Sequence, residues 1–132
     1  MTVDIRKTLY AAKLSQLRDP TLPSREVRTL TAELTTILAD IAIEPPSPTE
    51  MIAVIVILRS GMVMMDVFLS KFPPETNIIV YHLGIFRDKK TLQPVEYYNK
   101  MSSKSPNVKH AYILDPVIAT GGTADAAIQV VK

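Results

Sequence analysis

The sequence of 132 residues contains no cysteine. Disulfide bonds, a thiolate nucleophile and a zinc site with cysteine ligands are therefore excluded. Imidazoles are scarce as well, because His82 and His110 are the only histidines. They lie on separate apolar runs, which favours a buried, hydrogen-bonded core histidine at each position over a ligand. On this basis no residue is assigned to metal binding.

Long apolar segments are also missing. The longest apolar run, from Met51 to Leu58, ends at Arg59 and is far shorter than the ~20 residues needed to span a bilayer. Residues 1–7 lack the apolar core of a secretory signal. The net charge is only +2, with basic residues spread among acidic ones, so no basic patch indicates nucleic acid. We expect a cytoplasmic protein that binds neither a membrane nor nucleic acid.

The hydrophobic pattern changes near the middle of the chain. Apolar residues at helical spacing predict a helix over 5–17 and a second from Ser24, as its cap, to about Ile43. The prolines of 44–49 then end the helical pattern. Strands and helices are predicted beyond this break, with room for a hairpin in the polar stretch 86–100 and a loop over 100–109. The strands are 52–58, 77–83 and 110–114, and the helices are 62–72 and 123–131.

This order of elements predicts the fold class. Two helices followed by alternating strands and helices are typical of an α/β fold, in which helices flank a mainly parallel sheet. A length of 132 residues fits one domain. We therefore expect a single α/β domain over residues 1–132.

The strongest local signal lies between the third predicted strand and the last predicted helix. Gly121 and Gly122 would let the backbone turn tightly, so that the amides of 120–123 point at a phosphate near the positive end of the helix dipole. Asp115, at the strand end, would accept hydrogen bonds from sugar hydroxyls. The alternative is an ordinary strand–helix turn with a threonine cap. The residues of this predicted phosphate loop are Asp115, Pro116, Val117, Ile118, Ala119, Thr120, Gly121, Gly122 and Thr123.

Two arginines stand at the ends of the other predicted strands. A buried strand that ends in Arg59 needs an anion or an acid for the guanidinium, which holds phosphate oxygens well. The alternative partner of Arg59 is Asp66. Arg87 would bind a second phosphate group, or else form a surface ion pair with Asp88. Because the carboxyl ends of parallel strands meet at one edge, the three segments predict one crevice for a ligand with more than one phosphate group.

These segments resemble, in order, the motifs of the uracil phosphoribosyltransferases, members of the type I phosphoribosyltransferases. The resemblance implies transfer of ribose 5-phosphate from phosphoribosyl pyrophosphate to uracil, which gives uridine monophosphate and pyrophosphate. It also implies magnesium with that substrate and a homo-oligomer, most simply a dimer. The matching stretches are 14–19, 58–61, 84–88, 91–100 and 114–123.

The same resemblance implies a role for each site. The loop from Asp115 to Thr123 would hold the ribose 5-phosphate, with Asp115 on the sugar hydroxyls, and Arg59 and Arg87 would bind the pyrophosphate. No residue is assigned a catalytic role beyond positioning. The rate would come from holding the reactants together and from stabilising charge on the departing pyrophosphate.

The sequence also departs from the family pattern. Ser60 stands where the family usually has alanine, Val63 where it has glycine, and Phe86 where it has tyrosine. The family's hairpin arm is reduced to 44–49, and its uracil-binding segment would follow Lys132, so we expect a shortened member with no residue assigned to uracil. Two other functions stay open: a non-catalytic phosphoribosyl- or nucleotide-binding or regulatory module, and a fragment whose exposed sheet edge pairs with a partner.

Overall fold

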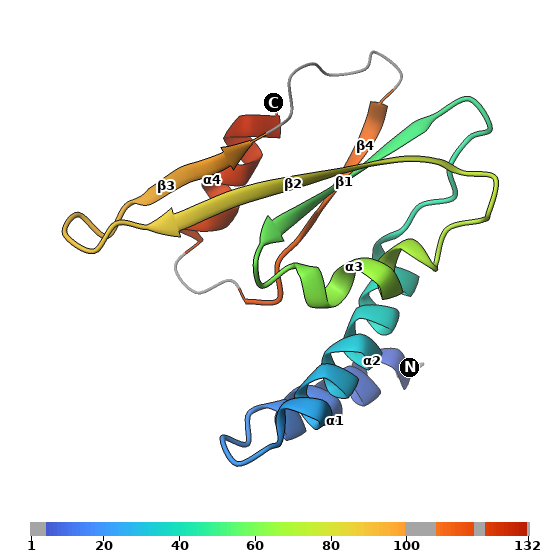
Figure 1. The fold of residues 1–132 in the computed structure, drawn as a ribbon. Helices are drawn as coiled ribbons and strands as arrows, with labels where there is room; N and C mark the ends of the chain where they lie inside the picture. The colour runs from blue at the N-terminus through green and yellow to red at the C-terminus, as the bar shows by residue number, and fades with distance from the viewer. Residues whose placement is uncertain (1–4, 100–107, 118–120, 132) are drawn as a thin grey trace.

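The computed structural model describes residues 5–99, 108–117 and 121–131. The strands of this part form one sheet with the order β3-β2-β1-β4 (Figure 1). β1 is parallel to β2 and to β4, whereas β3 is antiparallel to β2. The predicted α/β class with a mainly parallel sheet is therefore confirmed. In chain order the elements are α1 (Ile5–Leu17), α2 (Ser24–Ala42), β1 (Met51–Leu58), α3 (Met62–Leu69), β2 (Asn77–Arg87), β3 (Pro94–Asn99), β4 (Val108–Leu114) and α4 (Gly122–Val131).

β1 lies at the centre of the fold, and its residues 52–57 are all buried. Successive side chains of a strand point to opposite faces of a sheet, so β1 supplies two cores. Ile52, Val54 and Val56 pack against α3 on one face. Ala53, Ile55 and Ile57 pack against α4 and β2 on the other face. A continuous apolar run without alternation is the pattern of a strand buried on both faces, and β1 is such a strand.

α1 and α2 form a helical hairpin that extends away from the sheet (Figure 1). An ion pair between Lys13 and Glu33 joins the two helices. At the turn between them, Asp19 accepts hydrogen bonds from the hydroxyl and the amide of Thr21, and these bonds lower the pKa of Asp19. Ala39, near the end of α2, joins the core that lies under α3. The hairpin is therefore anchored to the rest of the molecule through the last turns of α2.

The ends of several elements differ from the prediction. Ser24 does not cap α2, because Pro23 occupies the cap position and its carbonyl accepts the amides that follow. The third helix ends at Leu69, and the chain continues as a turn to the buried Phe72. β2 runs on to Arg87, because pairing with β3 prolongs it. Most of the predicted loop, residues 100–107, lies outside the described residues.

Candidate functional site

Two loops meet at the carboxyl edge of the sheet. One is the β1–α3 loop, residues 59–61, and the other is the β4–α4 loop, which begins at Asp115. Parallel pairing sets Val56 opposite Leu114, so Asp115, the first residue after β4, follows at the level of Ile57. The topology therefore brings the segment with Arg59 beside the segment with Asp115, although more than fifty residues separate them in the chain.

Gly61 shows how closely the two loops approach. A Cβ atom at this position would lie 2.2 Å from the carbonyl oxygen of Leu114 and 2.8 Å from that of Ile57. No side chain other than hydrogen fits such a space without moving the backbone. The amide of Gly61 donates to the carbonyl of Ile57 at 2.7 Å, and the peptide bond between Leu58 and Arg59 is cis. The β1–α3 loop is therefore pressed against the end of β4.

A hydrogen bond between side chains also joins the two loops. The hydroxyl of Ser60 donates to Oδ1 of Asp115 at 3.3 Å. The amide of Val117 donates to the same oxygen at 3.4 Å. Ser60 is exposed and Asp115 is half-buried. The sequence shows Ser60 only as a departure from the family pattern, and its one signal is a hydroxyl next to a glycine at the end of a buried strand.

The predicted phosphate loop ends at the start of α4. Gly121 adopts φ of 88°, a left-handed conformation that favours glycine, and its carbonyl accepts the amide of Asp125 at 2.8 Å. α4 begins at Gly122, so Thr123 lies inside the helix and not at its cap. Ile118, Ala119 and Thr120 lie outside the described residues. Ala126 and Ala127 of α4 pack in the same core cluster as Ile57 and Ile85, near the carboxyl ends of β1 and β2. The start of a helix suits an anion.

The two arginines are placed differently. Arg59 is exposed directly after β1, and within the described residues it forms no ion pair with Asp66. Arg87 is the last residue of β2, three residues beyond Gly84, the register partner of Leu58. Three strand residues span about 10 Å, so the backbone of Arg87 lies on the β2–β3 hairpin beyond the end of β1. Nothing is described of its side chain.

The sequence offers Asp88 as an alternative partner of Arg87. In the structure, the Asp88 carboxylate stabilises the turn between β2 and β3. Its carboxylate accepts the amides of Thr91 and Lys90 at 2.9 Å and 2.8 Å. These two bonds lower the pKa of Asp88. Leu92 completes the turn with φ of 60°, and its amide donates to the carbonyl of Asp88. The acid is therefore part of the turn that joins β2 to β3.

An apolar cavity of about 440 Å³ opens beside the two site loops. Ser60, Pro116 and Val117 line it from the two site loops. Side chains of the first three helices form the other walls, so the helical hairpin contributes to the surroundings of the site. These side chains are Tyr10, Leu14, Leu17, Val27, Arg28, Thr31, Leu34, Leu38, Val63 and Met64.

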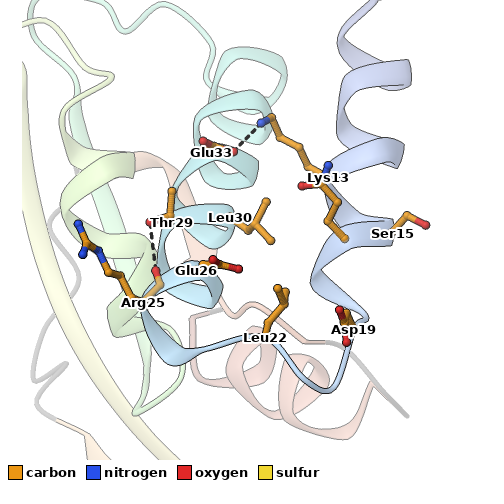
Figure 2. A pocket seen from close by; sticks show the side chains of 10 residues that line it. Lys13, Ser15, Asp19, Leu22, Arg25, Glu26, Thr29, Leu30 and Glu33 are labelled. Carbon is orange, nitrogen blue, oxygen red and sulfur yellow. Dashed lines mark hydrogen bonds and ion pairs between the residues drawn. The ribbon is translucent and has the colours of Figure 1, made fainter.

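A larger groove of about 950 Å³ lies between α1 and α2, away from the strand ends (Figure 2). Its walls carry both signs of charge, and Figure 2 shows Lys13 reaching across to Glu33. Thr29 donates its hydroxyl to the carbonyl of Arg25 on the same helix. The Lys13–Glu33 ion pair joins the two helices across this groove, which is therefore part of the helix–helix interface.

His110 is not the buried core histidine that the sequence predicted. Its side chain is 43% exposed and lies between two carboxylates, because Nδ1 bonds to Glu50 and Nε2 lies 3.1 Å from Glu44. The bond to Glu50 raises the pKa of His110 and lowers the pKa of Glu50. This cluster lies at the start of β1 and β4, the edge opposite to the crevice. His82, on β2, is half-buried, and no hydrogen bond reaches its ring from the described residues.

The cluster predicts a defined pH dependence of stability. The raised pKa of His110 stabilises the fold below its ordinary value of 6.5, and this contribution is lost as the pH rises through the folded-state value. The lowered pKa of Glu50 stabilises the fold above 4.5, and this contribution is lost as the pH falls through the folded-state value. We expect His110→Gln to reduce the melting temperature most between pH 4.5 and pH 6.5, where both contributions are present. His82→Gln is the control, and thermal melts that show the same pH dependence for both variants would contradict the assignment.

The fold and the site together define an α/β protein of the phosphoribosyltransferase type. The solved structure of the AQ2163 protein from Aquifex aeolicus has the same fold, with a TM-score of 0.76 and 26% sequence identity over 98% of this chain and 69% of that chain. Residues 45–132 match the family model for uracil phosphoribosyltransferase. The chain belongs to the uracil phosphoribosyltransferase family.

Individual relatives agree with this assignment. The urg2 protein of Schizosaccharomyces pombe is 46% identical over 117 residues, which are 88% of this chain and 54% of that protein. The uracil phosphoribosyltransferase of Deinococcus radiodurans is 34% identical over 150 aligned positions, which cover all of this chain and 70% of that enzyme. The chloroplastic enzyme of Arabidopsis thaliana is 38% identical over 83% of this chain and 36% of its own length. The chain thus spans about half the length of the Schizosaccharomyces pombe protein.

Proposed function

We propose that the chain binds phosphoribosyl pyrophosphate in the crevice between the β1–α3 and β4–α4 loops. There it would take part in transferring ribose 5-phosphate to uracil, with uridine monophosphate and pyrophosphate as products. The observation that carries the proposal is the bond from Ser60, the neighbour of Arg59, to Asp115 at the carboxyl edge of β1 and β4. Family membership supports the choice of substrate, since relatives are named for this transfer.

Each group in the crevice has a chemical role in this proposal. The amides at the start of α4 and the hydroxyl of Thr123 would bind the 5′-phosphate. Asp115 would accept hydrogen bonds from the ribose hydroxyls. The exposed guanidinium of Arg59 would bind the pyrophosphate and stabilise the negative charge that develops as it leaves. Arg87 is assigned to the same group by resemblance alone. Holding the sugar and the leaving group in the reactive geometry would lower the activation barrier.

Magnesium is proposed as an ion that the substrate would carry into the site. Among the described residues there is no group of three or more histidine or acidic side chains that could hold a metal ion. Mg²⁺ usually binds one or two carboxylates together with substrate phosphates and water. Asp115 is a carboxylate of the crevice that meets this requirement, and when bound the ion would neutralise charge on the pyrophosphate. This chain's own contribution is then to bind and orient the phosphates with Arg59 and α4.

The alternative function is a non-catalytic module that binds a phosphoribosyl group or a nucleotide. No described residue is assigned to uracil, so the two functions differ at the base and not at the sugar phosphate. An assay with labelled uracil and phosphoribosyl pyrophosphate separates them, because transfer yields uridine monophosphate and the module yields none.

Light scattering on the same sample tests the proposed dimer. No helix of the described chain has the length and apolarity to cross a membrane, and a cytoplasmic location stays a prediction.

The role of Arg59 gives a prediction about ligand preference. We expect Arg59→Ala to weaken phosphoribosyl pyrophosphate by about 1.5–3 kcal/mol, because a hydrogen bond to a charged group is lost. Uridine monophosphate has no pyrophosphate, so its affinity should change much less. Arg25→Ala, which removes an exposed arginine from the helical hairpin, is the charge control. Calorimetric titration with both ligands checks the prediction, and equal weakening of the two ligands by Arg59→Ala would show that the role is misassigned.

A further inference from the structure

The contact between Ser60 and Asp115 is the only side-chain hydrogen bond between the two site loops within the described residues. Both of the contacts to the Asp115 carboxylate, from the hydroxyl of Ser60 and from the amide of Val117, reach Oδ1. No hydrogen bond reaches Oδ2 within the described part of the chain. The protein therefore fixes the position of Oδ1, and this also sets the direction in which Oδ2 points.

The two contacts constrain the carboxylate in different ways. The Val117 amide belongs to the same loop as Asp115 and ties the side chain to its own backbone. The Ser60 hydroxyl comes from a different strand end, and the backbone beside it is fixed because Gly61 packs against the carbonyl of Leu114. A donor on a fixed backbone limits the rotation of the carboxylate about its χ2 angle, which is otherwise broad for aspartate.

We propose that Ser60 is a positioning residue that acts through Asp115. Its hydroxyl holds Oδ1, so that Oδ2 faces the hydroxyls of a bound ribose 5-phosphate group. This inference rests on the proposed function of the crevice, and it names the group that sets the sugar end of the substrate. Ser60 needs no contact with the reacting atoms, and its effect is on the recognition of ribose hydroxyls.

Calorimetric titration of the folded chain with two sugar phosphates tests the proposal. Ribose 5-phosphate carries the 2-hydroxyl, and 2-deoxyribose 5-phosphate lacks it. We expect Ser60→Ala to weaken ribose 5-phosphate by about three- to tenfold, the range for an ordinary hydrogen bond, and to weaken the deoxy sugar less. Ser60→Thr keeps a hydroxyl and should restore most of the affinity. Ser70→Ala is the matched control, because this exposed serine bonds to the carbonyl of Val67 at the end of α3.

A double-mutant cycle with Asp115→Ala, which removes the carboxylate, asks whether Ser60 acts through it. The effects of the two substitutions on ribose 5-phosphate should not add, since each removes the same interaction. Additive effects, or equal weakening of both sugar phosphates by Ser60→Ala, would overturn the role of Ser60. Unchanged ribose 5-phosphate affinity in Ser60→Ala overturns it too, and leaves the proposed function intact if phosphoribosyl pyrophosphate still binds. Wild-type protein that binds neither phosphoribosyl pyrophosphate nor ribose 5-phosphate overturns the proposed function, and the role of Ser60 with it.

Discussion

Replacing Gly61 with alanine is expected to lower the free energy of unfolding by about 3 kcal/mol or more. The added Cβ would lie 2.2 Å from the carbonyl oxygen of Leu114, well inside contact distance. The position of the Cβ is fixed by the backbone and the carbonyl is itself backbone, so no side-chain rotation relieves the overlap. For a chain of 132 residues this loss corresponds to a fall in melting temperature of roughly 10 °C.

Gly121→Ala is the matched comparison for Gly61→Ala. A Cβ atom at Gly121 meets nothing within 4 Å among the described residues, and the obstacle there is its φ of 88°. The left-handed conformation costs a residue with a Cβ about 1–2 kcal/mol, so this variant should melt closer to the wild type. Differential scanning calorimetry on the three proteins measures both effects. A Gly61→Ala protein as stable as the wild type would mean that the two loops do not approach as closely as described.

The second large effect is expected at Thr123. Thr123→Asp places a negative charge in the first turn of α4, where the 5′-phosphate is proposed to bind. Two like charges about 4 Å apart repel by about 4 kcal/mol at an effective dielectric constant near 20. We therefore expect affinity for phosphoribosyl pyrophosphate to fall by about 100-fold or more.

Thr123→Asn isolates the charge in this experiment. Asparagine has the shape of aspartate without its charge, so it should reduce the affinity by much less than aspartate does. Asp is itself favourable near a helix N-terminus, so the Asp variant should remain folded. Calorimetry measures the affinities and circular dichroism checks the fold. If the Asp and Asn variants bind the substrate equally well, the phosphate does not lie at this helix end.

The sequence predicts those features of the fold that depend on local pattern. The unbroken apolar run of β1 identifies a strand buried on both faces, and its place after two helices indicates the α/β class. The extension of β2 to Arg87 follows from pairing with β3, within the stretch where the sequence leaves room for a hairpin. The start of α2 is similar, because Pro23 takes the cap position that Ser24 suggests by residue type.

The site was predictable as a set of strand ends but not as a set of contacts. Parallel register brings the loop with Arg59 beside Asp115, and strand order alone implies this. The bond from Ser60 to Asp115 depends on how the β1–α3 loop turns, which no local pattern specifies. The sequence assigns His110 to the core because it lies on an apolar run, and no local pattern reveals its acidic partner. Its partner Glu50 lies sixty residues away in the chain, and only the tertiary fold brings the two together.

The central claim is that phosphoribosyl pyrophosphate binds at the carboxyl edge of β1 and β4. A titration of the ¹⁵N-labelled chain with this compound and Mg²⁺, followed by amide chemical shifts, tests it most directly. We predict saturable shifts at Arg59, Ser60, Gly61, Val117 and the first turn of α4, with little change in the groove between α1 and α2. Shifts confined to that helical groove, or no saturable shifts at all, would contradict the account.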